Sequence, residues 1–114
     1  MIEVFLGKAL ICFLDQCYPV LTGYRTPVGV YELIERKTTQ VGYGGQILQF
    51  KETPSMVYAV HRVFPYDRRM NRAVVLKTAP AEVRNKVTMG CINVAPEVFE
   101  ILRTLPDKHI EIKP

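Results

Sequence analysis

Short apolar runs separated by turn-like residues limit the fold of this chain more than any other feature. Most of the runs are shorter than a typical helix and are rich in residues that favour β-strands. The sequence predicts strands over residues 2–6, 9–14, 17–21, 28–36, 46–50, 56–64, 73–76 and 109–113. We expect the last of these strands at the edge of a sheet.

One segment, residues 96–105, has the pattern of a helix instead. Pro96 suits a first helical position, and Glu97 and Glu100 complement the positive N-terminal end of a helix dipole. The apolar residues of the segment recur at helical spacing and form one stripe: Val98, Ile101, Leu102 and Leu105. We therefore expect a mainly antiparallel β sandwich with one short helix packed against it.

The length of 114 residues leaves room for one domain with a single core, which we place over residues 1–114. A content of 48% hydrophobic and 23% charged residues is ordinary for a soluble globular protein. The longest apolar run, residues 9–14, ends at Asp15 and is too short for a membrane span or a signal-peptide core. We expect neither a membrane-spanning helix nor a secretory signal in this sequence.

The net charge of +4 favours anionic or carboxylate-rich partners. Much of the excess lies in one basic stretch that contains Arg62, Arg68, Arg69 and Arg72. This stretch is either a solvated loop or a surface that faces a substrate or partner. In a nucleic-acid-binding β module, it would act together with three aromatic residues as stacking platforms: Tyr58, Phe64 and Tyr66.

The chain has three cysteines, and this odd number argues against a pure disulfide scaffold. No cysteine or histidine spacing resembles a zinc site, so we expect no metal and no cofactor. If residues 15–16 form a hairpin loop, Cys12 lies diagonal to Cys17 at about 7–8 Å between Cα atoms. That separation is too long for an unstrained disulfide. We expect both to be core residues, with a strained disulfide as the alternative.

Cys91 has the surroundings of a nucleophile. Gly90 lets the backbone approach a substrate closely, and the helix start at Pro96 supplies N–H groups and partial positive charge that lower a thiol pKa. A single cysteine in a small domain is also commonly a small buried hydrophobic residue. The spacing alone leaves both interpretations open.

The stretch around Cys91 resembles the catalytic signature of YkuD-like L,D-transpeptidases, in which a Ser or Thr, any residue, Gly, Cys, an apolar residue, and Arg or Asn follow one another. The matching residues are Thr88, Gly90, Cys91, Ile92 and Asn93. Upstream, Thr22, Gly23 and residues 26–31 resemble the family's entry motif, a Thr-Pro-x-Gly-x-aromatic run after a strand that ends in Gly. The two motifs with their flanking segments cover nearly all of the chain, and the resemblance implies the family's β sandwich.

A thiol nucleophile needs a base, and the candidates are His61 and His109. The resemblance implies His61, because the family's histidine lies on a strand upstream of the cysteine. Two positions depart from the family pattern: Arg62 replaces the usual Gly after this histidine, and Met89 replaces the His that often precedes Gly-Cys. The glycine-rich residues 40–45 are one candidate for the flap that covers the family's cleft.

The resemblance implies acyl transfer on peptidoglycan stem peptides through a thioester on Cys91, with release of the terminal D-alanine. The N–H groups of Gly90 and Cys91 are the expected oxyanion donors. Thr88, Asn93 and Arg62 are the expected substrate-binding residues: the Thr88 hydroxyl would also pin the turn, and Arg62 would supply charge for a substrate carboxylate. We expect a carbapenem to form a covalent adduct on the thiol.

The acceptor that resolves the thioester sets the activity: an amine gives a cross-link, a free D-amino acid gives exchange, and water gives L,D-carboxypeptidase trimming. A peptidoglycan-damaging effector, in which trimming or exchange dominates, is the alternative within this chemistry. A basic nucleic-acid-binding module or a non-catalytic interaction domain lies outside it. The substrate implies action in the periplasm or cell wall. Either an export signal lies outside this sequence, or a secretion apparatus delivers the protein, with an immunity protein as a further partner.

Overall fold

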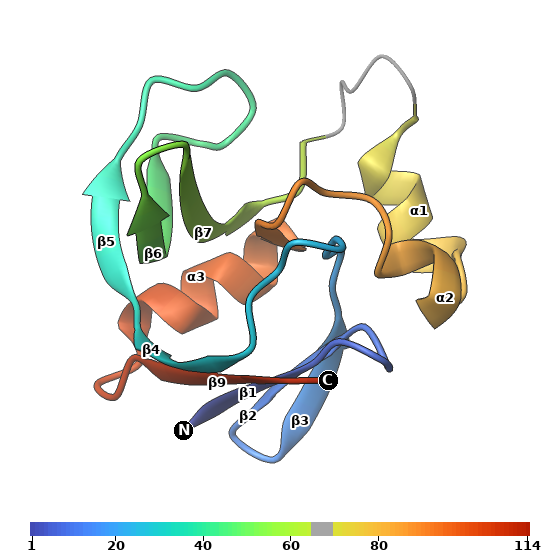
Figure 1. Cartoon of the computed structure of the whole chain (residues 1–114), viewed down its shortest axis with the longest axis horizontal. Coiled ribbons are helices and arrows are strands. Elements are labelled where there is room, and N and C mark those ends of the chain that lie inside the picture. The colour runs from blue at the N-terminus through green and yellow to red at the C-terminus, as the bar shows by residue number, and fades with distance from the viewer. Residues whose placement is uncertain (65–69) are drawn as a thin grey trace.

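The computed structural model describes residues 1–64 and 70–114, which form two stacked β-sheets and three helices (Figure 1). The first sheet has its strands in the order β3-β2-β1-β9-β4. These strands are β1 (Ile2–Phe5), β2 (Leu10–Phe13), β3 (Gln16–Pro19), β4 (Gly29–Glu32) and β9 (His109–Lys113). β1 and β9 pair in parallel, whereas the other neighbours are antiparallel.

The second sheet has its strands in the order β5-β6-β7-β8. These strands are β5 (Ile34–Lys37), β6 (Gln46–Thr53), β7 (Met56–Arg62) and β8 (Ile92–Val94). β7 and β8 are parallel, and a parallel pair needs a crossover connection. This connection carries the helices α1 (Arg72–Thr78) and α2 (Ala81–Arg84), which lie to the right in Figure 1.

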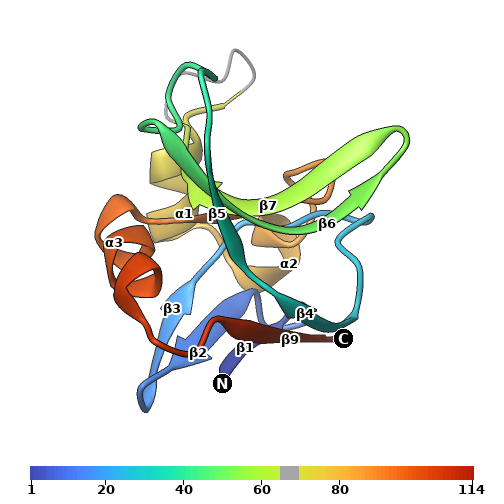
Figure 2. The ribbon, with the colours of Figure 1, turned by 90° about the vertical axis from the view of Figure 1, so that its left-hand side faces the viewer.

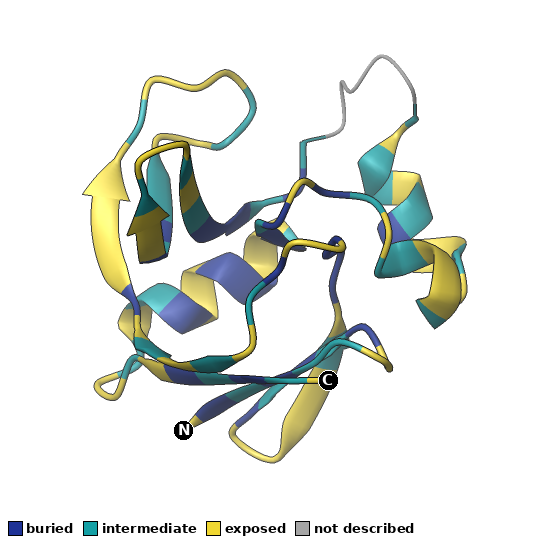
Figure 3. Cartoon of the chain, viewed as in Figure 1, coloured by how far each residue is buried: buried dark blue, intermediate teal, exposed yellow. Residues whose placement is uncertain are grey.

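Helix α3 (Pro96–Thr104) lies at one side of the space between the two sheets (Figures 1 and 2). Its buried residues Val98, Phe99 and Leu102 join the core that both sheets share. Ile101, which the sequence places in the buried stripe, is 36% exposed. Figure 3 shows buried residues on α3 and on both sheets, whereas β5 is exposed along its length. Among the described helices, none is long and apolar enough to cross a membrane.

The predicted fold class is confirmed, because the described strands form a sandwich in which five of seven strand pairs are antiparallel. The predicted strand over residues 73–76 is wrong, since this segment lies in α1. The Asn71 side chain caps that helix by accepting hydrogen bonds from the N–H groups of Ala73 and Val74 at 3.1 and 3.3 Å. Helical spacing then buries only Leu76 of the apolar run. The sandwich therefore carries two further helices beside the one expected.

Two strands differ from the prediction in their place in the sheets. The predicted strand over residues 28–36 is two strands, β4 and β5, which belong to different sheets. Leu33 lies between them and is 3% exposed, so the chain passes from one sheet to the other through the core. The strand over residues 109–113 does not lie at an edge, because β9 is flanked by β1 and β4. Its Ile110 and Ile112 are buried there.

Cys12 and Cys17 form a disulfide, so the prediction that they are two core residues is wrong. The hairpin loop is Leu14–Asp15, one residue earlier than expected, and both residues adopt positive φ angles of 50° and 62°. Such angles are typical of a tight two-residue hairpin. Cys12 therefore lies directly opposite Cys17, with 4.0 Å between the Cα atoms, and Cys17 is exposed.

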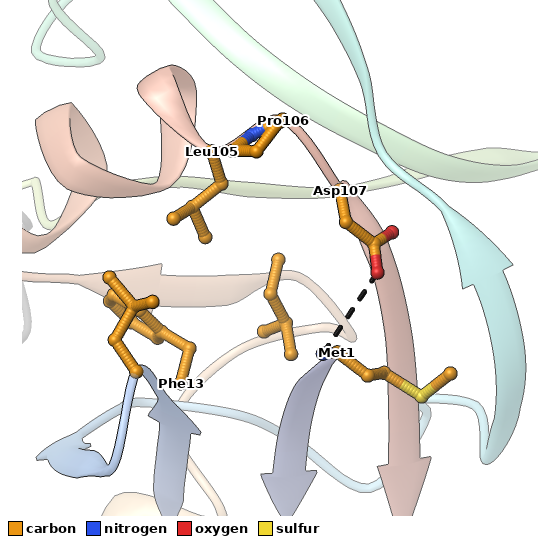
Figure 4. A pocket seen from close by; sticks show the side chains of 7 residues that line it. Met1, Phe13, Leu105, Pro106 and Asp107 are labelled. Carbon is orange, nitrogen blue, oxygen red and sulfur yellow. Dashed lines mark ion pairs between the residues drawn. The ribbon is translucent and has the colours of Figure 1, made fainter.

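A small pocket of about 140 Å³ opens where the start of the chain, the β2–β3 hairpin and the end of α3 meet (Figure 4). Its walls are mainly apolar and include Ile2, Phe13 and Leu105. The Asp107 carboxylate lies 3.9 Å from the Met1 amino group at its rim. None of the lining residues carries a thiol or an imidazole, so this pocket lacks the groups for nucleophilic chemistry.

Candidate active site

The two motifs of the sequence lie side by side. Leu21 and Asn93 form an antiparallel bridge, in which the N–H of each donates to the carbonyl of the other at 3.0 and 2.8 Å. The Thr22 carbonyl accepts hydrogen bonds from the N–H groups of Val87 and Thr88. The upstream motif thus holds the turn that leads to the cysteine.

Gly23 forms the closest part of this contact. A Cβ atom at this position would lie 1.8 Å from the Thr88 carbonyl oxygen, which is a main-chain atom with little freedom to move. The N–H of Gly23 donates to the buried Thr26 hydroxyl at 3.0 Å, so the motif is also braced within itself. Only glycine leaves space for the turn at Thr88 to dock here.

The Thr88 hydroxyl closes the turn before Cys91. It accepts a hydrogen bond from the Gly90 N–H at 3.1 Å and donates one to the Cys91 carbonyl at 2.6 Å. Gly90 has a φ of 142°, and a Cβ there would lie 2.6 Å from the Tyr58 ring. In this structure the Gly90 N–H is therefore not free to serve an oxyanion, and the Thr88 donor is not free to bind a substrate, because both groups hold the turn.

Cys91 is a free, partly buried thiol that comes directly before β8. Its Sγ donates to the Val57 carbonyl on β7 at 3.6 Å. Burial raises the pKa of this thiol, while a hydrogen bond from the Ala59 backbone and the charge of Arg72 act in the opposite direction. β8 separates Cys91 from α3, so the predicted effect of the helix start on the thiol is wrong, since a helix dipole acts mainly within its first turn.

His61 lies on β7, is 2% exposed and pairs across the parallel strands with Asn93. The thiol of Cys91 contacts the same strand at the Val57 carbonyl and at the Ala59 backbone, and Ala59 lies two residues, about 6.5–7 Å, from His61. The candidate nucleophile and base thus lie along one strand. In the described structure, however, the ring nitrogens of His61 bond to other partners than the thiol.

The partners of His61 determine which of its nitrogens holds the proton. Nδ1 lies 2.8 Å from the Arg62 carbonyl, which can only accept, so Nδ1 carries the hydrogen. Nε2 lies 3.2 Å from the Nδ2 of Asn93, which donates to it. Arg72 Nη1 donates to the Oδ1 of Asn93 at 3.0 Å, and this contact sets the amide in that orientation. Burial lowers the pKa of His61 to about 4, so the imidazole is neutral at pH 7 with its lone pair on Nε2.

The glycine-rich loop over residues 38–45 covers His61. The ring of Tyr43 stacks on the imidazole, with 3.8 Å between centroids and an angle of 18° between the ring planes. Arg62 Nη1 donates to the Tyr43 carbonyl at 2.9 Å and to Gln46 Oε1 at 3.1 Å, which ties the loop to β7. Burial raises the pKa of Tyr43, and the electrostatic effect of Cys91 adds to this, whereas the charge of Arg72 acts in the opposite direction.

In this structure, Arg62 and Asn93 are both engaged within the protein. The Arg62 guanidinium pairs with the Glu100 carboxylate and lies 4.3 Å from the centre of the Phe99 ring. Asn93 is 0% exposed and its amide bridges two other side chains. Their substrate-binding roles stay predictions.

The sequence interpretation missed Tyr43 and Arg72. Tyr43 was expected only as part of a loop, although an aromatic residue between glycines is suited to cover a site. Arg72 is one of several arginines in the basic stretch, and no local signal in the sequence marks it as the one that turns inward to Asn93. Of that stretch, Arg68 and Arg69 lie outside the described residues, as does Tyr66. No group of three His, Cys, Asp or Glu residues that could hold a metal ion occurs in the described part of the chain.

Comparison with known proteins gives a likeness of fold. No model of a known protein family matches the chain, and no curated protein matches it. Among solved structures, the fold is similar to that of an L,D-transpeptidase (Yku) from Stackebrandtia nassauensis, with a TM-score of 0.62 and 13% sequence identity. The match covers 99% of this chain and 54% of the other, so this chain spans about half of that protein's length. At this level of identity, the likeness shows a shared β-sandwich fold.

Proposed function

We propose that residues 1–114 form a single catalytic domain, a cysteine acyltransferase of the L,D-transpeptidase kind that acts on peptidoglycan stem peptides. The observation that carries this proposal is a free thiol, Cys91, that lies against the strand β7, which also carries a neutral imidazole, His61. The likeness of the fold to a solved L,D-transpeptidase supports the choice of reaction.

In the first step, a substrate peptide draws the thiol away from the Val57 carbonyl. Nε2 of His61 takes the thiol proton while the sulfur attacks the carbonyl carbon that follows the L-centre of the diamino acid, so that a C–S bond forms. A neutral base suits this step, because the resting thiol is protonated and its proton must be removed as it attacks. The Asn93 amide releases Nε2 in the same movement.

In the second step, the C–N bond to the terminal D-alanine breaks, and the imidazolium of His61 returns its proton to the departing amine. The product is a thioester on Cys91. We propose the Cys91 N–H as an oxyanion donor, and the Gly90 N–H joins it only if the bond to Thr88 opens. An acceptor amine, a free D-amino acid or water then attacks the thioester and restores the thiol.

The disulfide between Cys12 and Cys17 supports a site of action in the periplasm or cell wall, since structural disulfides persist mainly in oxidising compartments. The peptidoglycan substrate lies in the same place. A peptidoglycan-damaging effector would meet this condition equally, and the ratio of hydrolysis to cross-linking in the assay below separates it from a wall-building enzyme.

Release of D-alanine from a tetrapeptide stem tests the proposal. The wild-type protein should release D-alanine, whereas Cys91→Ala should release none while it keeps its circular dichroism spectrum. His61→Ala should lose at least about 10²-fold in rate, the lower range for a positioned acid or base. A pentapeptide that ends in D-alanyl-D-alanine should be a poor donor, because the attacked bond must follow an L-centre. Equal turnover of the pentapeptide would assign the protein to another class of thiol peptidase.

A further inference from the structure

Three side chains from three elements form one hydrogen-bonded line through the candidate site. Arg72 comes from α1, Asn93 from β8 and His61 from β7. The distances along the line are 3.0 Å from Arg72 Nη1 to Asn93 Oδ1 and 3.2 Å from Asn93 Nδ2 to His61 Nε2. The line ends at the Arg62 carbonyl, 2.8 Å from His61 Nδ1. Arg72 belongs to neither sequence motif.

The orientation of the Asn93 amide decides what faces Nε2. An amide can turn by 180° with almost no change of shape, and the turn exchanges a donor for an acceptor. With the donor toward Nε2, the ring faces one donor and one acceptor, so it holds one proton and stays neutral. With the amide oxygen toward Nε2, the ring would face two acceptors, since the Arg62 carbonyl lies at Nδ1, and the doubly protonated cation would then be favoured.

Arg72 selects between these two orientations. A guanidinium has donors and no acceptor, so it accepts only the orientation in which the Oδ1 of Asn93 faces it. The turned amide would place two donors against each other inside the protein, where Asn93 is fully buried and lacks water to compensate.

We propose that Arg72 is a positioning residue that keeps His61 neutral, with its lone pair on Nε2, by holding the Asn93 amide in one orientation. The inference rests on the proposed role of His61 as the base for Cys91. As a consequence, Arg72, which lies on a helix outside both motifs, keeps His61, before substrate binds, in the neutral form that can accept the thiol proton.

The charged and titratable groups around the imidazole are few in the described structure. Cys91 lies before β8, Tyr43 of the glycine-rich loop stacks on the ring, and the charge of Arg72 on α1 also disfavours a second proton on the imidazole. Arg62, next to His61 on β7, turns its guanidinium to Glu100 on α3. The hydrogen-bonding effect of Arg72 must therefore be separated from the effect of its charge.

Nitrogen NMR of histidine-labelled protein measures the protonation of each ring nitrogen of His61 directly. Comparison of variants then separates the hydrogen-bonding effect of Arg72 from the effect of its charge. Wild-type His61 should stay neutral with the proton on Nδ1 well below pH 6. In Arg72→Met, the pH at which His61 becomes charged should rise by about one unit or more, the usual size for loss of a hydrogen bond to a charged group. In the Asn93→Leu background there is no amide to orient, so Arg72→Met reports only the effect of the charge there and should shift the titration of His61 less.

Lys77→Met is the matched control, since it removes one positive charge from an exposed position on the same helix. It should leave His61 as in the wild-type protein. In Asn93→Asp, two acceptors face the ring, so His61 should be charged at pH 7. The proposal is overturned if Arg72→Met titrates like Lys77→Met, or if Arg72→Met shifts the titration of His61 as much in the Asn93→Leu background as in the wild-type protein, which would leave only an effect of charge. These spectra do not depend on turnover, so a failure of the proposed function is recognised separately.

Discussion

The buried, neutral state of His61 predicts a specific dependence of stability on pH. Burial lowers the pKa of this imidazole to about 4, whereas in the unfolded chain it has its ordinary value of 6.5. The unfolded state therefore binds more protons between these two values, and stability falls as the pH falls through this window. Above pH 6.5 the imidazole is neutral in both states and contributes no pH dependence.

The size of the effect follows from the difference of 6.5 − 4 = 2.5 pKa units. At about 1.4 kcal/mol for each unit, the folded protein should lose about 3 kcal/mol of unfolding free energy between pH 7 and pH 4 through this residue. That is a large share of the 5–15 kcal/mol typical of a domain. The protein should therefore be distinctly less stable in mild acid.

Urea unfolding of the wild-type protein and of His61→Gln over this pH range measures the effect. Gln is neutral at every pH and offers both a donor and an acceptor to the former partners of the ring. Hydrogen bonds to Arg62 and His109 lower the pKa values of Glu100 and Asp107, so protonation of these carboxylates in acid also destabilises the folded protein, but equally in the wild type and in His61→Gln. The difference between the two proteins therefore isolates His61. If both lose stability in parallel from pH 7 to pH 4, the imidazole is not held neutral by burial, and the neutral-base mechanism fails with it.

Three further perturbations test other parts of the structure. Gly23→Ala should lower the free energy of unfolding by about 3 kcal/mol, because its Cβ meets a main-chain oxygen. Gly45→Ala meets no atom within 4 Å but has a φ of 95°, so it should lower this free energy by about 1–2 kcal/mol. Equal losses in urea unfolding would refute the docking of the two motifs at Gly23. Replacing Cys12 and Cys17 together by Ser should lower stability by about 2 kcal/mol, as expected for a loop closed over a sequence separation of 5, and an unchanged melting temperature would contradict this. Arg62→Met should release the glycine-rich loop from the imidazole, seen as faster amide hydrogen exchange in the loop, whereas unchanged exchange would show that the stacked tyrosine holds the loop without it.

The local patterns of the sequence predict most of the strands, but not how distant segments pair. The alternation in residues 109–113 marks β9 correctly, yet its position between β1 and β4 depends on pairing with strands far away in the sequence. The hairpin before β3 is predicted one residue late, because Leu14 and Asp15 adopt positive φ angles without a glycine to signal them. Because of this one-residue error, the prediction places Cys12 diagonal to Cys17 instead of directly opposite it. The disulfide is then predicted only as a strained alternative.

In the candidate site, too, the sequence does not predict which distant side chains contact one another. The resemblance indicates Cys91 and His61 as candidate nucleophile and base, because each residue type is tied to a chemical task. It does not show which arginine turns inward: Arg62 and Arg72 have equal charge, and only the fold turns Arg62 to Glu100 and Arg72 to Asn93. The partner that orients the imidazole is the main-chain carbonyl of Arg62. Every residue has such a carbonyl, so the sequence does not indicate which one takes this role.

The most direct test of the central claim is the intact mass of the protein after incubation with a carbapenem. We expect one covalent adduct per chain, located on Cys91 by peptide mapping, because acylation needs both an activated thiol and an acyl site shaped for this substrate class. Cys91→Ala should carry none, and His61→Gln should be acylated at least about 10²-fold more slowly. An unmodified wild-type protein, or an adduct that forms equally fast in His61→Gln, would contradict the assignment of this thiol and imidazole as nucleophile and base.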